Sequence, residues 1–255
     1  MASYPAHPLR EREDIVPDVV REGRTLPWRE AAKESDALRP MLIEQFRHED
    51  FRGKVVLDVG TGEGRLAFVA ANAGARVVGV DLDRTKLMHA RAYAGIRDIR
   101  NVEFVLGDVD KTTYHEFARD PIDAVVSNLC MSPEIVWHAS RALRPDGVFV
   151  FCCHHGDHWK ETRRGSQWAF YEDVMTDLLQ DNRFDVAFMG VDTTVARFDE
   201  LREVELFLRD SVVRRWVEDG RWEELSDSFA RGEKQLTLSY LIVKARKVAA
   251  AYETT

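Results

Sequence analysis

Residues 55–65 read Val55-Val56-Leu57-Asp58-Val59-Gly60-Thr61-Gly62-Glu63-Gly64-Arg65. The apolar, β-branched run predicts a buried strand, and the three alternating glycines after it predict a loop that opens a helix. Glycine is needed where the backbone turns sharply, or where a ligand must approach it without a side chain in between. We therefore expect a ligand-binding turn between this strand and the helix that follows.

The spacing of these glycines differs from that of dinucleotide-binding proteins. Those proteins have the pattern G-x-G-x-x-G and hold a pyrophosphate at the helix N-terminus. This chain has G-x-G-x-G followed by Arg65, and Asp58 lies two residues before the first glycine. A carboxylate beside the ligand favours a cation over a diphosphate.

Short apolar runs alternate with amphipathic stretches from Lys54 to Cys153. Nearly continuous apolar runs are typical of strands covered on both faces, and their alternation with helices predicts a parallel sheet with right-handed crossovers. We expect strands at residues 55–59, 76–80, 102–106, 124–127 and 148–152, and helices at 65–73, 84–94, 115–119 and 134–143.

The flanking segments have weaker patterns. Residues 1–26 are polar and rich in proline, which predicts an arm with at most short helical turns. Residues 28–46 have helical spacing that Pro40 interrupts. Beyond Cys153 we expect a polar loop, a helix at 168–179, strands at 184–191 and 236–243, and a helical segment between those two strands.

Three further motifs complete a resemblance to a known family. Asp81 ends the second strand, Gly107-Asp108-Val109 follows the third, and residues 141–148 read RALRPDGV before the fifth. With Asp58-x-Gly60-x-Gly62-x-Gly64, this ordered set resembles the class I S-adenosylmethionine-dependent methyltransferases of small-molecule type. The turn before the fifth strand departs from the family's L-(K/R)-P-G-G pattern, because Asp146 replaces its first glycine.

The resemblance implies an α/β fold. It is a Rossmann-like, seven-stranded and mostly parallel sheet in the order 3-2-1-4-5-7-6, with strand seven antiparallel and helices on both faces. It also implies an N-terminal arm and helical lid at residues 1–53 and a methyltransferase domain at residues 54–255. A helical insertion at about residues 199–231 would precede the last strand.

The same resemblance implies S-adenosyl-L-methionine as the cofactor, bound across the carboxyl ends of the strands. Asp81 would hold the ribose hydroxyls, and Asp108 with the amide of Val109 would read the adenine edge. The cofactor-binding residues that we expect are Asp58, Gly60, Thr61, Gly62, Gly64, Asp81, Leu82, Asp108, Val109 and Asn128.

Histidines gather at the end of the fifth strand, in Cys152-Cys153-His154-His155-Gly156-Asp157-His158-Trp159. A histidine with a pKa of about 6.5 can accept a proton from a hydroxyl, so we expect His154 or His155 as the catalytic base. A metal site through His154, Asp157 and His158, or ordinary packing, stays open at this point, and we assign no metal ligand. Because the sulfonium methyl is already activated, alignment and exclusion of water are the main requirements, and a base is optional.

The expected methyl acceptor is inferred from a motif that the sequence lacks and from its net charge. The segment after the fourth strand, Ser127-Asn128-Leu129-Cys130, differs from the (N/D)-P-P-(Y/F/W) tetrad of methyltransferases that act on amino groups of bases and glutamine. The chain has 36 Lys and Arg against 44 Asp and Glu, a net charge of −8, which argues against nonspecific nucleic-acid binding. We therefore expect a small-molecule acceptor. Methylation of protein or RNA, and a noncatalytic cofactor-binding domain, stay as alternatives.

The sequence also bears on location. No apolar run approaches the ~18–20 residues that cross a bilayer, and the first residues lack the apolar core of a signal peptide. The three cysteines exclude a disulfide framework. We expect a cytoplasmic protein with no membrane partner.

Overall fold

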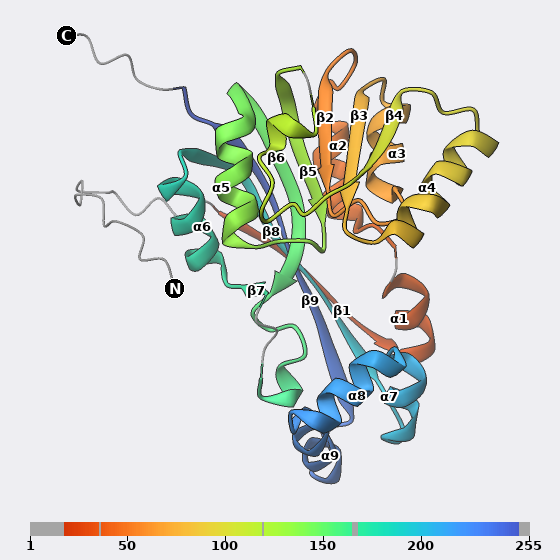
Figure 1. The fold of residues 1–255 in the computed structure, drawn as a ribbon. Helices are drawn as coiled ribbons and strands as arrows, with labels where there is room; N and C mark the ends of the chain where they lie inside the picture. The colour runs from red at the N-terminus through yellow and green to blue at the C-terminus, as the bar shows by residue number, and fades with distance from the viewer. Residues whose placement is uncertain (1–17, 36, 119, 165–167, 250–255) are drawn as a thin grey trace, which may run out of the picture.

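The computed structural model describes residues 18–35, 37–118, 120–164 and 168–249. A single sheet forms its centre, with helices on both faces (Figure 1). The strand order is β1-β8-β9-β6-β5-β2-β3-β4, and β7 pairs with β6 beside this path. β9 is antiparallel to both β6 and β8, whereas the other strand pairs are parallel. None of the helices in the described ranges is long and apolar enough to cross a membrane.

The strands are β1 (Val19–Pro27), β2 (Val55–Val59), β3 (Arg76–Asp81), β4 (Val102–Leu106), β5 (Ile122–Asn128), β6 (Leu143–His155), β7 (Ala169–Phe170), β8 (Phe184–Arg197) and β9 (Gln235–Lys247). The α-helices are α1 (Trp28–Ser35), α2 (Pro40–Arg47), α3 (Arg65–Asn72), α4 (Arg84–Ile96), α5 (Pro133–Ala142), α6 (Glu172–Asp181), α7 (Arg202–Phe207), α8 (Asp210–Glu218) and α9 (Arg221–Ala230). Two short 3₁₀ helices, η1 (Tyr114–Glu116) and η2 (Lys160–Thr162), complete the described elements.

The central strands are apolar on both sides because each face of the sheet is covered. In β2, Leu57 and Val59 pack into a core with residues of α5 and α6. Val56, which points the other way, packs into a second core with residues of α2, α3 and α4. This two-sided burial explains the uninterrupted apolar run that precedes the glycines.

Local signals set where the helices beside the strand ends begin. The Asp83 carboxylate accepts hydrogen bonds from the amides of Thr85 and Lys86 and caps α4. Ser132 caps α5 in the same way, with Pro133 at the first helical position. Both caps follow directly after strand ends, so they fix the loops at the carboxyl edge of the sheet.

The sheet contains nine strands, so the expected number of seven is corrected, with β1 and β7 as the additional strands. The other seven lie in the order β4-β3-β2-β5-β6-β9-β8, with β9 antiparallel. β1 lies in the stretch expected to be an arm and pairs with β8 at the edge of the sheet. β7 lies in the expected helix at 168–179, which begins only at Glu172. β6 is also longer than expected, because it continues through His155 to pair with β7 and β9.

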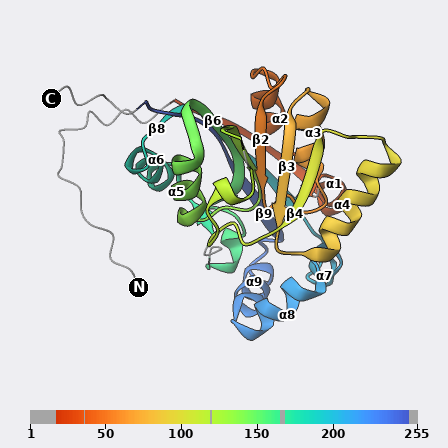
Figure 2. The same ribbon diagram turned by 45° about the horizontal axis from the view of Figure 1, so that its top comes forward.

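The ends of the long strands β8 and β9 pack with α7, α8 and α9 to form a lobe beside the rest of the sheet. Figure 1 shows β8 and β9 extending past the ends of the other strands toward α7, α8 and α9, and Figure 2 shows the same helices below the sheet. These three helices fall within the helical segment expected between the last two strands. A third core forms here around the fully buried Trp216, with Leu225 and Leu236. The lobe therefore lies on the side of the molecule where the parallel strands end.

Candidate active site

The glycine turn is packed against the segment that follows β5. Gly60 has a φ of +68°, and a Cβ added there would lie 2.3 Å from the Cβ of Cys130. Both the left-handed backbone and the close approach therefore require glycine. The structure thus brings the carboxyl ends of β2 and β5 together.

A hydrogen bond joins the same turn to the end of β3. The Gly62 amide donates to Asp81 Oδ2 at 2.7 Å, and the Asp83 amide donates to Asp81 Oδ1 at 2.8 Å. The carboxylate is oriented by these two bonds and keeps further acceptor capacity on each oxygen. A Cβ on Gly62 would meet only the Cδ of Lys86, at 3.9 Å, so the loop backbone is open to a ligand.

Asp58 lies beneath the turn and is 1% exposed. Thr61 Oγ1 donates to Asp58 Oδ2 at 2.6 Å, whereas Oδ1 has no hydrogen-bond partner among the described residues. Burial raises the pKa of Asp58 to about 7, although hydrogen bonding by Thr61 and by the Ala67 backbone lowers it; the nearby Asp81 carboxylate adds a smaller increase. A cation at this position would favour the charged form of the carboxyl.

Several carboxylates near Cys130 create a negative electrostatic field at this edge of the sheet. Burial raises the pKa of its thiol to about 12, and the carboxylates of Asp110, Asp81 and Asp58 add to the shift. The thiol therefore stays protonated and is a poor nucleophile. The same carboxylates favour a positively charged ligand beside the glycine turn.

Apolar side chains lie at the same edge. Leu82, Leu106 and Leu129 are 65%, 46% and 44% exposed, and each stands at or just after the end of a parallel strand. Leu129 has a φ of +59°, and its amide donates to the carbonyl of Cys152 at 2.7 Å. Exposed leucines at the ends of β3, β4 and β5 give the site an apolar surface as well as a charged one.

The remaining expected cofactor residues lie at the same edge. The Asp108 carboxylate pairs with Lys111 at 2.9 Å and accepts a hydrogen bond from the Asp110 amide. These partners hold the pKa of Asp108 below its usual range. Val109 is buried after β4, and Asn128 ends β5 opposite Cys152.

The two histidines expected to act as a base have different surroundings. His155 is 3% exposed, and its Nδ1 accepts from the Asp157 amide at 3.2 Å. The proton is therefore assigned to Nε2, which donates to Glu172 Oε2 at 3.0 Å. Both ring nitrogens of His155 are thus engaged within the fold.

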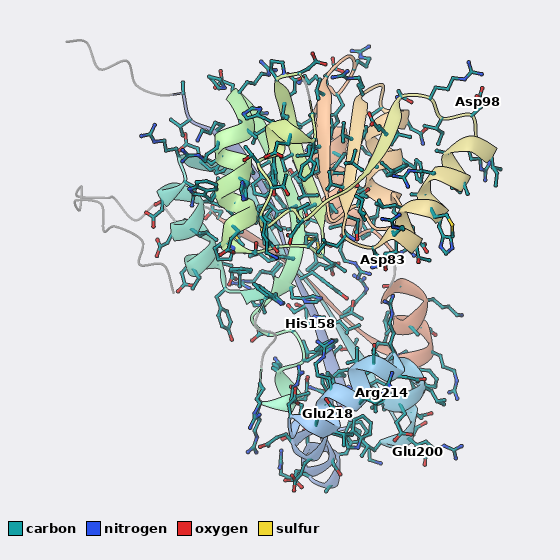
Figure 3. All side chains as sticks on the ribbon, in the orientation of Figure 1. Asp83, Asp98, His158, Glu200, Arg214 and Glu218 are labelled. Carbon is teal, nitrogen blue, oxygen red and sulfur yellow. The ribbon has the colours of Figure 1, made fainter. Side chains whose placement is uncertain are left out.

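His154 points to the opposite face of β6. Its ring stacks on that of His158, with centroids 4.1 Å apart, and lies near Tyr240. It makes no hydrogen bond with any residue that the structure describes. Burial lowers the pKa of His154 to about 4, so the ring is neutral at physiological pH with a lone pair available. Figure 3 shows His158 where β8 and β9 leave the rest of the sheet, below Asp83 and above Arg214 of α8.

The described side chains of His154, Asp157 and His158 do not form a set of metal ligands. His158 Nδ1 lies 3.1 Å from the Ser239 amide nitrogen, and that ring is 2% exposed. Across the ranges that the structure describes, no group of three or more His, Cys, Asp or Glu side chains could hold a metal ion.

Comparison with known proteins assigns the family. Residues 50–174 match a family model described as a methyltransferase domain. A protein named "Probable S-adenosylmethionine-dependent methyltransferase" from Mycolicibacterium smegmatis is 27% identical over 181 residues, 68% of each chain. This chain belongs to the class I S-adenosylmethionine-dependent methyltransferases.

Other relatives of the methyltransferase differ in the acceptors that their names state. Protein arginine N-methyltransferase PRMT10 of Oryza sativa subsp. japonica is 34% identical over 122 residues, 44% of this chain, and the chain spans only 30% of that protein's length. A solved S-adenosylmethionine-dependent methyltransferase from Mesorhizobium loti has a TM-score of 0.53 at 19% identity, covering 82% of this chain and 96% of that one. The structural likeness supports the fold and leaves the acceptor open.

Sequence reasoning did not single out several residues at this edge. Leu106 and Leu129 were not distinguished from core leucines, since only their position at strand ends reveals their exposure. Tyr240, which stands opposite His154 in the sheet, lies more than eighty residues away in the chain. The available signal was positional: an apolar residue that directly precedes a Gly-Asp pair, as in Leu106-Gly107-Asp108.

The Gly60 turn gives a first prediction. Gly60→Ala should lower the free energy of unfolding by about 1–3 kcal/mol, because the new Cβ meets Cys130 and the backbone is left-handed. Gly95→Ala is the matched control: it lies inside α4 with nothing within 4 Å of the added Cβ, and should be neutral or stabilising by up to ~1 kcal/mol. Urea unfolding measures both, and equal stabilities for the two variants would contradict the packing described here.

Proposed function

We propose that this chain transfers a methyl group from S-adenosyl-L-methionine to a small-molecule acceptor by in-line displacement. The main support is the glycine turn at 60–64, whose Gly62 amide is hydrogen bonded to Asp81 at the carboxyl edge of the sheet. In that arrangement an open backbone, an oriented carboxylate and a negative field lie within one site. When bound, the cofactor supplies an activated methyl group on a positively charged sulfur.

The residues of the edge suit the separate parts of that cofactor. Asp81 keeps acceptor capacity for the two ribose hydroxyls, and Leu82 and Leu106 offer apolar surface to the adenine ring. Asp108, charged at neutral pH, accepts from an exocyclic amino group. One buried oxygen of Asp58 has no hydrogen-bond partner among the described residues, and this carboxylate attracts the positive end of the ligand. Asn128 and the amide of Val109 stay as predicted contacts.

His154 is the better candidate of the two histidines for accepting a proton. Its nitrogens make no hydrogen bond within the described residues, whereas those of His155 are engaged by Asp157 and Glu172. A base with a pKa of about 4 is weak. It therefore suits a proton that becomes strongly acidic only as the acceptor atom gains the methyl group.

Side chains beyond the strand ends support an apolar or aromatic small molecule as the acceptor. The ring of Trp159 lies 6.0 Å from that of His154 and 4.9 Å from that of Trp216. Tyr240 adds a further ring at 6.0 Å from His154. We also propose that the N-terminal helices α1 and α2 form a lid over the cofactor. The alternative of a protein acceptor has the name of the rice relative in its favour.

The pKa of Asp58 gives a pH-dependent prediction for cofactor binding. A positive ligand favours the ionised carboxyl, so affinity should rise with pH up to about 7 and then level off. Between pH 8 and pH 6 we expect a loss of about tenfold, since affinity falls at most tenfold per pH unit below the pKa. Calorimetric titration at pH 6, 7 and 8 measures this. Asp58→Asn should bind more weakly and without this pH dependence, and a parallel pH profile in the variant would remove Asp58 from the role.

A labelled methyl donor tests the activity and the acceptor together. Incubated with cell extract and donor, the wild-type chain should place label in the small-molecule fraction rather than in protein or RNA. Asp81→Ala removes the proposed ribose contact and should weaken donor binding about tenfold or more, which corresponds to ~1.4 kcal/mol. Label in protein would favour the protein alternative. No label in any fraction despite donor binding would favour the noncatalytic alternative.

Substituting His154 tests the proton acceptor. His154→Ala should lower kcat by about 10²–10⁴ while donor binding is kept. In the wild-type chain this residue should leave kcat constant between pH 6 and pH 8, because its pKa lies near 4. His155→Ala serves as the comparison and should act mainly through stability, since that ring is buried against Glu172. A kcat within twofold of wild type in His154→Ala would remove His154 from the role of base.

A further inference from the structure

The strand β1 has one free edge. It pairs with β8 along all nine residues, and the structure places no described strand on its other side. Only Val19, Arg24 and Leu26 are partly buried, and the other six residues are exposed. A long unpaired edge presents a row of backbone donors and acceptors to another strand.

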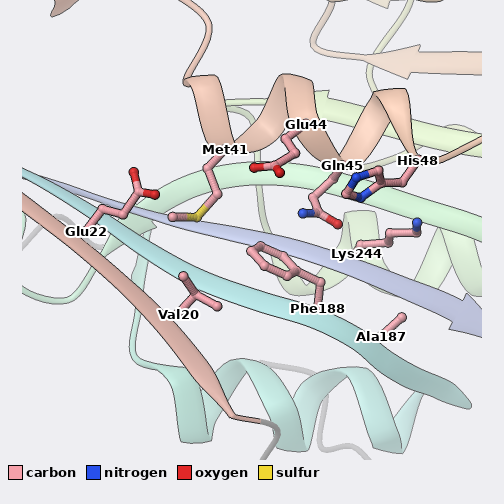
Figure 4. A pocket seen from close by; sticks show the side chains of 9 residues that line it. All are labelled: Val20, Glu22, Met41, Glu44, Gln45, His48, Ala187, Phe188 and Lys244. Carbon is pink, nitrogen blue, oxygen red and sulfur yellow. The ribbon is translucent and has the colours of Figure 1, made fainter.

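Open cavities lie on both faces of this edge. One of about 460 Å³ lies between β1 and α2 and is lined by Val20, Glu22 and Phe188 (Figure 4). Another of about 420 Å³ lies on the opposite face and is lined by Val19 and Tyr171 among others. Successive β1 side chains point to alternate faces, so one strand forms a wall of both cavities. Neighbouring side chains therefore leave the first part of β1 uncovered on each face.

Gly23 lies at the midpoint of β1, where no contact with the described residues requires a glycine. A Cβ at this position would meet nothing within 4 Å, and its φ lies outside the left-handed region. Glycine inside a strand is unfavourable by roughly 0.5–1 kcal/mol relative to alanine. Within a strand it often marks the close approach of another backbone, and none of the described residues approaches Gly23 in this way.

The charges of β1 do not protect its edge. Charged side chains usually prevent edge-to-edge pairing. Here Arg24 donates to Glu34 and to Asp192, at 2.7 and 3.2 Å, and Arg21 pairs with Glu172. Both arginines are thus paired with carboxylates of their own chain, which balances part of their charge and weakens the repulsion between two such edges.

We propose that β1 pairs antiparallel with β1 of a second copy of this chain, across a two-fold axis at Gly23. This register pairs the whole of Val19–Pro27. It places Glu22 opposite the partner's Arg24 and Val20 opposite the partner's Leu26, which gives opposite charges and apolar pairs on one face. Moving the register by one residue in one direction brings Arg21 opposite the partner's Arg24, and moving it by two brings Glu22 opposite the partner's Glu22. Charge and length therefore select the same register.

Disulfide trapping tests the axis. Opposite residues of an antiparallel pair have Cα atoms about 4.5–5.5 Å apart, which a disulfide can span. Gly23→Cys should therefore form a covalent dimer under mild oxidation, and the open space around Gly23 accepts the new side chain. Thr25→Cys is the matched control on the same face: its distance to the partner's Thr25 is on the order of 14 Å. Equal cross-linking of the two variants would overturn the register.

The mass in solution tests the association itself. The full chain should have twice the monomer mass of 29.3 kDa by light scattering. Glu22→Lys places like charges opposite one another and should raise the dimer dissociation constant at least tenfold, with Glu22→Gln in between. A monomer at every concentration would overturn the proposal. So would a dimer that forms only after residues 2–17 are deleted, because those residues would then cover the edge themselves. The proposal does not depend on methyl transfer, and calorimetric donor binding in each variant separates the two.

Discussion

The hydrogen bond from the Gly62 amide to the Asp81 carboxylate joins the glycine turn to the neighbouring strand, and the proposed site depends on it. The bond can form only if β2 and β3 are parallel neighbours whose carboxyl ends meet at one edge. The close contact between Gly60 and Cys130 brings β5 to the same place from the other side. The binding surface is thus made by strand order and backbone geometry before any long side chain contributes.

The difference between local backbone signals and long-range strand pairing explains which parts of the fold could be predicted. The strands Val55–Val59 and Val102–Leu106 were predicted with their observed bounds, because short apolar runs ended by Gly, Asp or Asn are strong local signals. β1 was missed because an edge strand with few buried residues has no apolar alternation to detect. Pairing with β8, more than 160 residues away, makes it a strand, and no local pattern encodes that contact.

The same distinction separates the proposed cofactor residues from the proposed acceptor residues. The glycines could be predicted from the sequence because their position depends on local backbone geometry, and Asp81 because the resemblance to the family implies its role. His154 and His155 could not be told apart, because neighbouring residues of a strand point to opposite faces and meet different partners. Glu172 engages one ring, whereas His158 and Tyr240 surround the other. Such partners come from distant elements, so the surroundings of these histidines are visible only in the fold.

The buried carboxyl of Asp58 links binding to stability. Its pKa of about 7, against 3.8 for an ordinary aspartate, means that the folded state retains a proton that the unfolded chain releases. The folded state therefore loses stability as the pH rises from about 4 to about 7, in the direction opposite to a salt-bridged aspartate. A cation bound beside Asp58 restores part of that loss, because it favours the charged form. Burying this carboxyl is unfavourable in the free protein, and a positive ligand that favours its charged form therefore binds more tightly. Binding of such a ligand also stabilises the folded state.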